Sequence, residues 1–348
     1  MFFVASIGAL VAPRRFLGRA ATGLLILFFS LFIGLRHEVG GDWFIYLENL
    51  QSIDHTSFQS SVIDNLINDP GYNFFSWISV SLGAGIYGVN LICAVLFSVG
   101  LIFFCRAQPR PWLALVVSIP YLVIVVGMGY TKQSVALGLF MPACLFLGNQ
   151  KIVRFSILIF IASLFHKTAV ILMIAALPSL LARNTFIGKL TSFLVIASSS
   201  LGAFYLFLAP KLDFLIYGYE DQAMQSQGAG IRVAMVFIPG VMMILFSGRD
   251  TSLGSLRNLW LGLSYAALGC AVLLLLIKSS TLVDRLALYC IPLQLVVATR
   301  IHDWRLVNIR KTYLNLLVII LFGMVQFVWL NYALTASAWY PYKNILFL

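Results

Sequence analysis

Residues 16–46 read FLGRAATGLLILFFSLFIGLRHEVGGDWFIY, an apolar run that ends abruptly in charge. The run Phe16–Leu35 has about the 20 predominantly apolar residues that a helix needs to cross a bilayer. The segment Arg36–Tyr46 then gathers an arginine, a histidine and two acids around a pair of glycines. Such a concentration of charge is unusual in so apolar a chain, so we expect this segment to be part of the functional site of the protein.

The composition of the whole chain extends this prediction to many spans. Of the 348 residues, 61% are hydrophobic and 10% are charged, whereas soluble domains average about 45–50% and 25%. So few polar side chains cannot coat a water-soluble particle, and several further runs approach the length of a membrane helix. We therefore expect an all-α, polytopic integral membrane protein in which residues 1–348 form a single membrane domain.

The formal charge of +11 raises the question of a nucleic-acid partner. No basic run is interleaved with aromatic residues on a soluble domain, so the sequence argues against a nucleic acid. The retention of basic residues in cytoplasmic loops explains the charge instead. The five cysteines all fall in apolar segments without metal-ligand spacing. We expect them to be core residues with no disulfide among them.

The apolar segments predict the following spans. Residues 2–12 are too short to cross a membrane alone and are expected to form an interfacial helix or a partial span. The longer segments lie near 17–35, 86–105, 112–129, 133–148, 155–181, 190–209, 231–247, 256–277, 286–300 and 312–331.

The distribution of charge predicts the orientation. On one side of this arrangement lie 15 of the 23 basic residues with two acids, and the other ten acids lie on the opposite side. The positive-inside rule makes the first side cytoplasmic. Its basic residues are Arg14, Arg15, Arg19, Arg106, Arg110, Lys151, Arg154, Arg183, Lys189, Arg249, Arg257, Arg300, Arg305, Arg310 and Lys311.

One long segment, 155–181, carries His166-Lys167 at its centre. If this segment crossed the membrane once, every later loop would change sides and the charge pattern would break down. We therefore expect two short helices or a re-entrant hairpin that turns at His166-Lys167 on the outer side. Counting the segment as two gives about eleven (ten to twelve) transmembrane or re-entrant helices, with the amino terminus inside and the carboxyl terminus outside.

Two longer segments, 36–85 and 210–230, are expected outside the membrane on the extracytoplasmic side. In the first, Asp69-Pro70 is a helix start signal for a short apolar helix over Tyr72–Leu82. Tryptophans fall near both expected boundaries, which indicates an aromatic belt at the membrane interfaces. The residues concerned are Trp43 and Trp339 near the outer boundary, and Trp112, Trp260 and Trp304 near the inner one.

Eight basic residues lie on the outer side and have no topological explanation. A basic side chain within a membrane helix costs about 2.5–3.5 kcal/mol on insertion scales. Such residues either hold an anion such as a phosphate or snorkel to the interface. We favour snorkelling for Lys278 and Lys343. We favour an anion site for Arg36, Lys132, Lys167 and Arg285, and the remaining two are Lys211 and Arg232.

Arg36, Glu38 and Asp42 lie within seven residues, and Gly40-Gly41 allows the chain to turn between them. The planar fork of an arginine binds two oxygens of a pyrophosphate at once. A carboxylate at the same mouth could act as a base for a sugar hydroxyl. The alternative is an arginine–carboxylate pair that only caps a helix end.

Two further pairs are candidates for chemistry. His166, beside Lys167, could be a base or a phosphate donor, or a core histidine whose hydrogen bonds are satisfied. Asp284 and Arg285 open the short span 286–300 and could simply neutralise each other. The sequence contains no P-loop, no H-E-x-x-H and no paired Cys/His set, so it supports neither a metal site nor a cofactor.

A set of short segments in order along the chain resembles the EpsG/Wzy family of polysaccharide polymerases. Lys132 stands where the family often has arginine, and Gly41 stands where it often has threonine. The segments are RHEVGGD at 36–42 with Tyr46, DPGYN at 69–73, KQSVA at 132–136, ASLFHKTA at 162–169, DRL at 284–286 and WYPYKN at 339–344.

The resemblance implies a membrane glycosyltransferase of GT-C-like architecture that works without a metal or cofactor. It would transfer a growing glycan from undecaprenyl pyrophosphate to another lipid-linked oligosaccharide repeat unit. Its place would be the bacterial cytoplasmic (inner) membrane, with the active site facing the extracytoplasmic side. Besides the lipid-linked oligosaccharide and the bilayer, a chain-length regulator and an export complex are expected partners.

The following roles are our hypothesis for this reaction. Asp42 is the first candidate for the base and His166 the second, and Glu38 would orient Arg36. Tyr72, Trp77 and Trp339 would stack on sugar rings, unless they are interface anchors. The residues expected to contact the pyrophosphate are Arg36, Lys132, Lys167 and Arg285.

Three other functions remain open from the sequence. A transporter or flippase of lipid-linked oligosaccharide would need charge along a path to both faces, whereas the unexplained charge here lies on one face. A surface-glycan ligase is chemically close to a polymerase, and the sequence separates the two poorly. A scaffold in an export complex would not need arginine, aspartate and histidine at one mouth.

Overall fold

The computed structural model is all-helical, as predicted. The part of the chain that it describes contains no strand, and a single bridge joins Arg36 to Asn344. Most of the segment 210–230 lies outside the described residues, as do Lys211 and Lys278. The structure describes residues 1–11, 18–51, 53, 58, 69–176, 186–203, 226, 228–277, 279–304 and 310–348.

The helices follow the apolar segments closely. In the first half they are α1 (Phe2–Val11), α2 (Arg19–Gly34), α3 (Trp43–Gln51), α4 (Pro70–Ser81), α5 (Gly85–Arg106), α6 (Pro111–Ser118) with its π-helical continuation η2 (Ile119–Gly127), α7 (Thr131–Gly148) and α8 (Ile152–Phe165). In the second half they are the 3₁₀-helix η3 (Lys167–Ala176), α10 (Phe186–Ala203), α12 (Ala229–Phe246), α13 (Leu256–Leu276), α14 (Ser280–Ala287), η9 (Leu288–Cys290), α15 (Pro292–Arg300) and α16 (Lys311–Tyr332).

Five of these helices are long and apolar enough to cross a membrane: α5, α7, α12, α13 and α16. A sixth candidate is the pair Ser280–Cys290 and Pro292–Arg300, which is bent by 44° at a short break. The described part of the chain is therefore all-helical, with five or six candidate membrane spans. The count of about eleven, which includes shorter apolar helices such as α2 and α8, stays a prediction.

The predicted break at His166 is confirmed. Helix α8 ends at Phe165, His166 itself is extended (φ −148°, ψ 103°), and η3 begins at Lys167. η3 then contacts α8, α7 and α10. The short helix predicted over Tyr72–Leu82 is also confirmed: α4 runs over Pro70–Ser81, with Pro70 in its first turn, where a missing N–H has no helical partner to lose.

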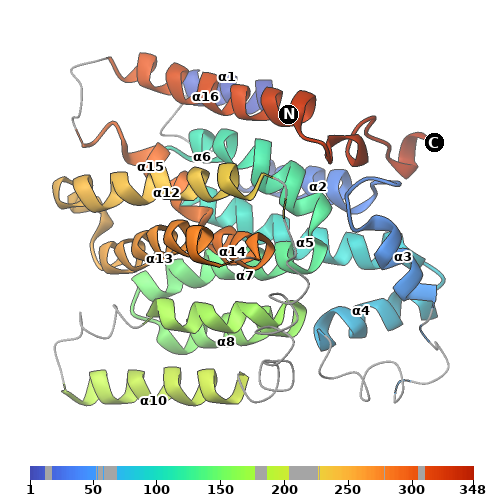
Figure 1. The fold of residues 1–348 in the computed structure, drawn as a ribbon, viewed down its shortest axis with the longest axis horizontal. Helices are drawn as coiled ribbons and strands as arrows, with labels where there is room; N and C mark the ends of the chain where they lie inside the picture. The colour runs from blue at the N-terminus through green and yellow to red at the C-terminus, as the bar shows by residue number, and fades with distance from the viewer. Residues whose placement is uncertain are drawn as a thin grey trace.

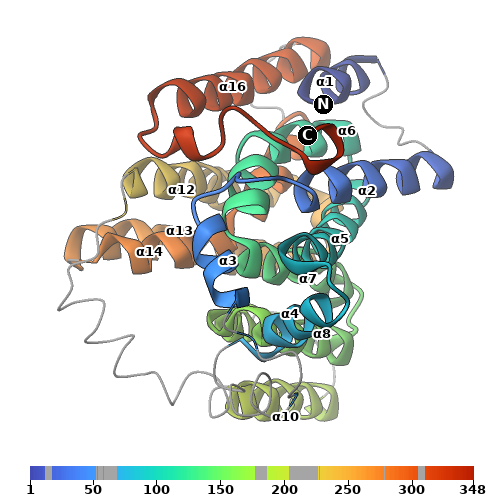
Figure 2. The same cartoon turned by 90° about the vertical axis from the view of Figure 1, so that its right-hand side faces the viewer.

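The helices stack in layers (Figure 1). α1 lies beside α16 along one edge of the bundle and α10 lies along the opposite edge, in both views (Figures 1 and 2). α5 packs between α2 and α7. A Cβ on Gly100 of α5 would lie 1.7 Å from the carbonyl oxygen of Gly138 on α7. These two glycines let the backbones touch, as small residues do between membrane helices.

The prediction of an aromatic belt at the membrane interfaces is wrong. The five tryptophans assigned to it are between 0% and 7% exposed, so they lie in the core and not at a lipid surface. Trp339, for example, donates its indole N–H to the carbonyl of Ile124 at 2.9 Å. Sequence position alone places a tryptophan at the end of a span but does not show which way its side chain points. The five cysteines are free and buried, as predicted.

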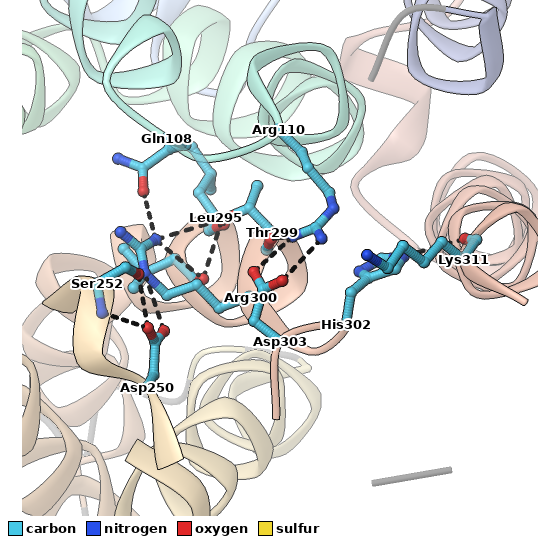
Figure 3. A network of polar contacts seen from close by, with 11 residues as sticks. Gln108, Arg110, Asp250, Ser252, Leu295, Thr299, Arg300, His302, Asp303 and Lys311 are labelled. Carbon is cyan, nitrogen blue, oxygen red and sulfur yellow. Dashed lines mark hydrogen bonds and ion pairs between the residues drawn. The ribbon is translucent and has the colours of Figure 1, made fainter. Parts of the chain in front are cut away.

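At one end of the bundle, a polar cluster joins the segment before α6 to the end of α15 (Figure 3). Arg110 donates to both carboxylate oxygens of Asp303, at 2.9 and 3.1 Å, and to the carbonyl of Thr299. This end lies far from α4, because α5 leads away from it over 22 residues, or about 33 Å. In the predicted orientation it is the cytoplasmic end.

Arg300 in the same cluster is 6% exposed. It donates to Gln108 at 2.7 Å, and its Nε lies 3.5 Å from a carboxylate oxygen of Asp250 (Figure 3). The other oxygen of Asp250 accepts from the backbone and hydroxyl of Ser252. The pair thus connects the ends of α12 and α15.

Replacing one member of this buried pair is expected to destabilise the fold strongly. Arg300→Met leaves the Asp250 carboxylate buried without its counter-charge, which costs about 3–5 kcal/mol. The double variant Arg300→Met/Asp250→Asn should recover most of that loss because no charge stays buried. Unfolding of the purified protein in mixed detergent micelles measures both. A single variant as stable as the parent contradicts the prediction.

Candidate functional site

Four segments distant in sequence meet at the other end of the bundle. They are the loop after α2, the start of α7, the turn between α8 and η3, and α14. Figure 2 looks onto this end and shows α3 in front, α4 and α8 below it and α14 to its left. Four of the eight unexplained basic residues belong to these segments, so each segment is described in turn.

Arg36 is 1% exposed and is a brace inside the protein. Its guanidinium donates to the carbonyls of Ile33 (2.6 Å) and Val39 (3.1 Å), and to the side chains of Thr131 (2.8 Å) and Asn90 (3.3 Å). Burial lowers its pKa from 12.5 to about 10, so it stays charged at neutral pH. Its donors face protein groups, and none of these bonds involves a carboxylate.

Arg36→Lys is expected to destabilise the protein by about 2–4 kcal/mol, because an ammonium cannot reach acceptors on the loop, α5 and α7 together. Unfolding of the purified variant measures the loss. Arg106→Lys, at an exposed position at the end of α5, is the matched control. Normal stability with lost activity would show instead that Arg36 contacts the substrate.

The glycine turn beside Arg36 is required by packing. Gly40 has φ +108°, and a Cβ there would lie 2.3 Å from the carbonyl oxygen of Met128. Its N–H donates to the carbonyl of Ala338 at 2.8 Å. The turn therefore lies directly against the end of η2, and it positions Asp42 two residues later.

The chain's last residues close the rim of this end. The N–H of His37 donates to the carbonyl of Lys343. Glu38 pairs with Lys343 at 2.9 Å on the exposed rim, and this contact lowers the pKa of Glu38. Glu38 does not orient Arg36, whose bonds go elsewhere, so that expectation is wrong. Lys343 is paired on the rim rather than snorkelling.

Asp42 is half-buried and lies within reach of three cations. Burial raises its pKa above the ordinary 3.8, and the charges of Arg285 and Lys132, a hydrogen bond from Tyr46 and the charge of Arg36 oppose that rise. The structure therefore brings Asp42 together with basic residues that stand 90 and 243 positions further along the chain.

Lys132, at the start of α7, is held by Asp69 and two aromatic rings. Its Nζ lies 3.0 Å from Asp69 Oδ2, 4.8 Å from the ring centre of Tyr72 and 5.8 Å from that of Tyr46. The other oxygen of Asp69 is buried and has no hydrogen-bond partner among the described residues. This oxygen is therefore an open acceptor beside the cation.

His166 occupies the turn between α8 and η3. Its Nδ1 lies 2.7 Å from the hydroxyl of Thr168 and 3.1 Å from that of Tyr289, so both hydroxyls hold one ring edge. Its charged neighbours are Asp69, Arg285, Lys132 and Lys167. His166 thus lies in the same electrostatic environment as Asp42.

Asp284 and Arg285 do not neutralise each other. Asp284 pairs with Arg232 of α12 through two bonds of 2.7 and 2.9 Å, and it also accepts from Ser226. Arg285 makes no ion pair with the described residues, and its carbonyl accepts from Gln133 at 2.8 Å. Its half-buried side chain is left to act on Asp42 and His166.

The structure therefore divides the predicted site residues into two sets. The first set lies at the end of the bundle where the loop after α2, the start of α7, the turn before η3 and α14 meet. It comprises Asp42, Lys132, His166, Lys167, Arg285 and Tyr72. The second set is engaged elsewhere: Arg36 is an internal brace, Glu38 is on the rim, and Trp339 is 6% exposed and packs against Trp329.

Sequence reasoning missed Asp69 as a site residue and Tyr289 altogether. Asp69 was visible as a helix start signal, but its contact with Lys132 joins residues 63 positions apart. Tyr289 lies in an apolar run and gave no signal. Among the described residues, no group of three His, Cys, Asp or Glu side chains could hold a metal ion.

One comparison with known proteins gives a match. A family model described as "EpsG family" matches residues 20–344, which is nearly the whole chain. No curated protein and no solved structure matches it.

Proposed function

Because the chain belongs to the EpsG family, we propose that it is a polysaccharide polymerase of the bacterial cytoplasmic membrane. It transfers a growing glycan from undecaprenyl pyrophosphate to the next lipid-linked oligosaccharide repeat unit. The observation that supports this is the convergence of basic residues from three distant segments on one carboxylate, Asp42, and one imidazole, His166.

The charge of this end suits a pyrophosphate. Among the described residues, four basic residues act on Asp42 or His166, and the carboxylates in this set are Asp42 and Asp69. These six groups together carry two more positive than negative charges. An anionic ligand would be drawn to such a site, and the fixed cations would neutralise the charge that develops as the pyrophosphate leaves. This supply of positive charge supports a metal-independent reaction.

In the proposed reaction, a hydroxyl of the acceptor sugar attacks the anomeric carbon of the donor glycan. The new glycosidic bond forms as the bond from that carbon to the pyrophosphate breaks, and the pyrophosphate leaves with its lipid. Asp42 accepts the proton of the hydroxyl, and His166 is the alternative base. Arg285, Lys132 and Lys167 hold the pyrophosphate.

Arg36 has a different role in this proposal from the one expected from its sequence. Its hydrogen bonds to Ile33, Val39, Thr131 and Asn90 fix the loop that carries Asp42. It acts as a positioning residue, and its charge lies near the site without a direct contact to the lipid.

The rest of the proposal concerns topology and partners. We place the site on the extracytoplasmic side, with about eleven transmembrane or re-entrant helices in a GT-C-like architecture. A chain-length regulator and an export complex are the expected protein partners. The excess of basic residues on one side of the predicted membrane arrangement, and of acids on the other, supports this orientation.

The proposal is tested with the purified chain in vesicles that contain a lipid-linked repeat unit. Longer glycans on the lipid are the expected product, resolved as a ladder on a gel. Movement of the repeat unit across the bilayer without lengthening indicates a transporter. Transfer to a different surface acceptor indicates a ligase. If the assay shows neither lengthening, nor movement across the bilayer, nor transfer to another acceptor, the proposal that the chain is an enzyme is contradicted.

A further inference from the structure

An apolar groove opens between α12, α15 and α16. It encloses about 210 Å³, which exceeds the roughly 150 Å³ of an apolar cavity that takes up benzene. Each helix lines it with one face, at a helical spacing of three or four residues. The lining residues are Met235, Ile238, Pro239 and Met242 of α12, Gln294, Val297, Ala298 and Ile301 of and just after α15, and Val318, Leu321, Phe322 and Val325 of α16.

The groove opens sideways. Ile238 and Leu321 on its two outer walls are 58% and 54% exposed, whereas Gln294 and Val297 at its back are 3% and 4% exposed. α12 and α16 are both candidate membrane spans. In a bilayer the mouth of the groove would therefore face lipid, and a hydrocarbon chain could enter it without passing through water.

The groove begins about one helical turn from the candidate site, measured along α12 towards its carboxyl end. Arg232, which pairs with Asp284 beside Arg285, stands three residues before Met235 on the same face of α12. The lining residues of α12 are three to ten positions further along the helix, or roughly 5–15 Å deeper. A lipid whose headgroup lies at Arg285 would thus have its chain at the depth of the groove.

Gln294 is the exception in an otherwise apolar lining. Its Nε2 is buried and has no hydrogen-bond partner among the residues that the structure describes. A buried amide N–H without an acceptor is costly. The double bonds of a polyisoprenoid are electron-rich and can accept weakly from such a donor, as other π systems do, whereas a saturated acyl chain cannot.

From this geometry we infer that the groove between α12, α15 and α16 binds the polyisoprenoid chain of the lipid-linked substrate. The inference rests on the proposed function for the identity of that lipid. The groove holds a short part of the chain next to the headgroup, and the remainder lies in the bilayer. Bound in this way, the chain positions the pyrophosphate beside Arg285.

Binding is tested without catalysis by placing a photoreactive benzoylphenylalanine at Phe322. The purified variant is irradiated in phosphatidylethanolamine and phosphatidylglycerol vesicles with undecaprenyl phosphate as a minor component. Mass spectrometry is expected to identify an adduct with undecaprenyl phosphate. Adducts with phospholipid alone, or no lipid adduct, overturn the inference.

Blocking the groove provides a matched pair of variants. Leu321→Trp fills it from α16, whereas Leu316→Trp places the same ring about 140° away on the same helix, at an exposed position that does not line the groove. The first is expected to abolish the adduct and to raise KM for the lipid-linked substrate roughly tenfold with kcat unchanged. Equal behaviour of the two variants overturns the inference.

Gln294→Leu tests the same groove by a substitution that packs well. The wild-type chain is expected to bind undecaprenyl phosphate more tightly than its fully hydrogenated analogue, and Gln294→Leu should lose that preference. No preference in the wild type contradicts the role of the amide. An undecaprenyl adduct without polymerisation would refute the proposed function alone, and polymerisation without the adduct would refute the groove alone.

Discussion

Asp42→Asn is expected to lower the rate of glycan transfer by about 10²–10⁴-fold, the usual contribution of a general base. Asparagine keeps the shape of the side chain and can still accept the hydrogen bond from Tyr46, but it cannot take up a proton. The loss should appear in kcat rather than in KM. Initial rates with a purified lipid-linked repeat unit measure it.

The pH profile ties this loss to the carboxylate. Burial raises the pKa of Asp42 above 3.8, and a base works only when it is deprotonated. Activity should therefore fall as the pH is lowered through that raised pKa, at a higher pH than for an ordinary aspartate. In Asp42→Asn this acid limb should be absent. A variant that keeps both the limb and the rate would exclude Asp42 as the base.

The stability of Asp42→Asn separates a catalytic loss from misfolding. The folded state holds the proton of Asp42 more tightly than the unfolded state, so this residue's contribution to stability is greatest below pH 3.8 and is lost as the pH rises through the raised pKa. Asparagine has no charge to bury, so the variant should be at least as stable as the parent at neutral pH. Glu48→Gln, at an exposed acid on α3, is the control and should keep full activity.

Arg285→Ala is expected to lower kcat by about 10²–10³-fold, the usual effect of removing a group that stabilises transition-state charge. Arg285 makes no ion pair with the described residues, so its charge is available to a ligand. Arg285→Lys should recover only part of the rate, because an ammonium cannot bind two phosphate oxygens through a planar fork. The same transfer assay measures both variants.

The two predictions are coupled through the pKa of Asp42. The charge of Arg285 lowers that pKa, so its removal should move the acid limb of the pH profile to a higher pH. A purely structural role for Arg285 would not move the limb. Arg106→Ala removes the same charge from an exposed position at the other end of α5 and should change neither rate nor profile. An unchanged limb in Arg285→Ala contradicts the proximity of the two groups.

Much of the fold was predictable because hydrophobicity acts locally. A helix in a bilayer must be apolar over its length, so each long run in the sequence shows its own span. The break at His166 was predictable because a polar pair interrupts such a run. The burial of the tryptophans was not predictable, since the end of a span can face lipid or protein with the same sequence.

The candidate site was predictable only in part, for a related reason. Charged residues in an apolar chain are conspicuous, so Asp42, Lys132 and Arg285 could be named from the sequence. Their partners could not. Arg36 was expected to hold a phosphate, but the acceptors that fill its fork come from α5 and α7 as well as its own loop.

The sequence by itself determined that this chain is helical, apolar and charged at few places, because each of these properties depends on a residue and its near neighbours. Only the tertiary structure decided which charges are satisfied. It paired Asp284 with Arg232 across 52 positions and left Arg285 beside Asp42. Which charges pair depends on the distances between helices that are remote in the chain. In a low-dielectric interior the interaction energy of two charges changes strongly over a few ångströms, so a small difference in distance decides whether a charge is paired or stays available to a ligand.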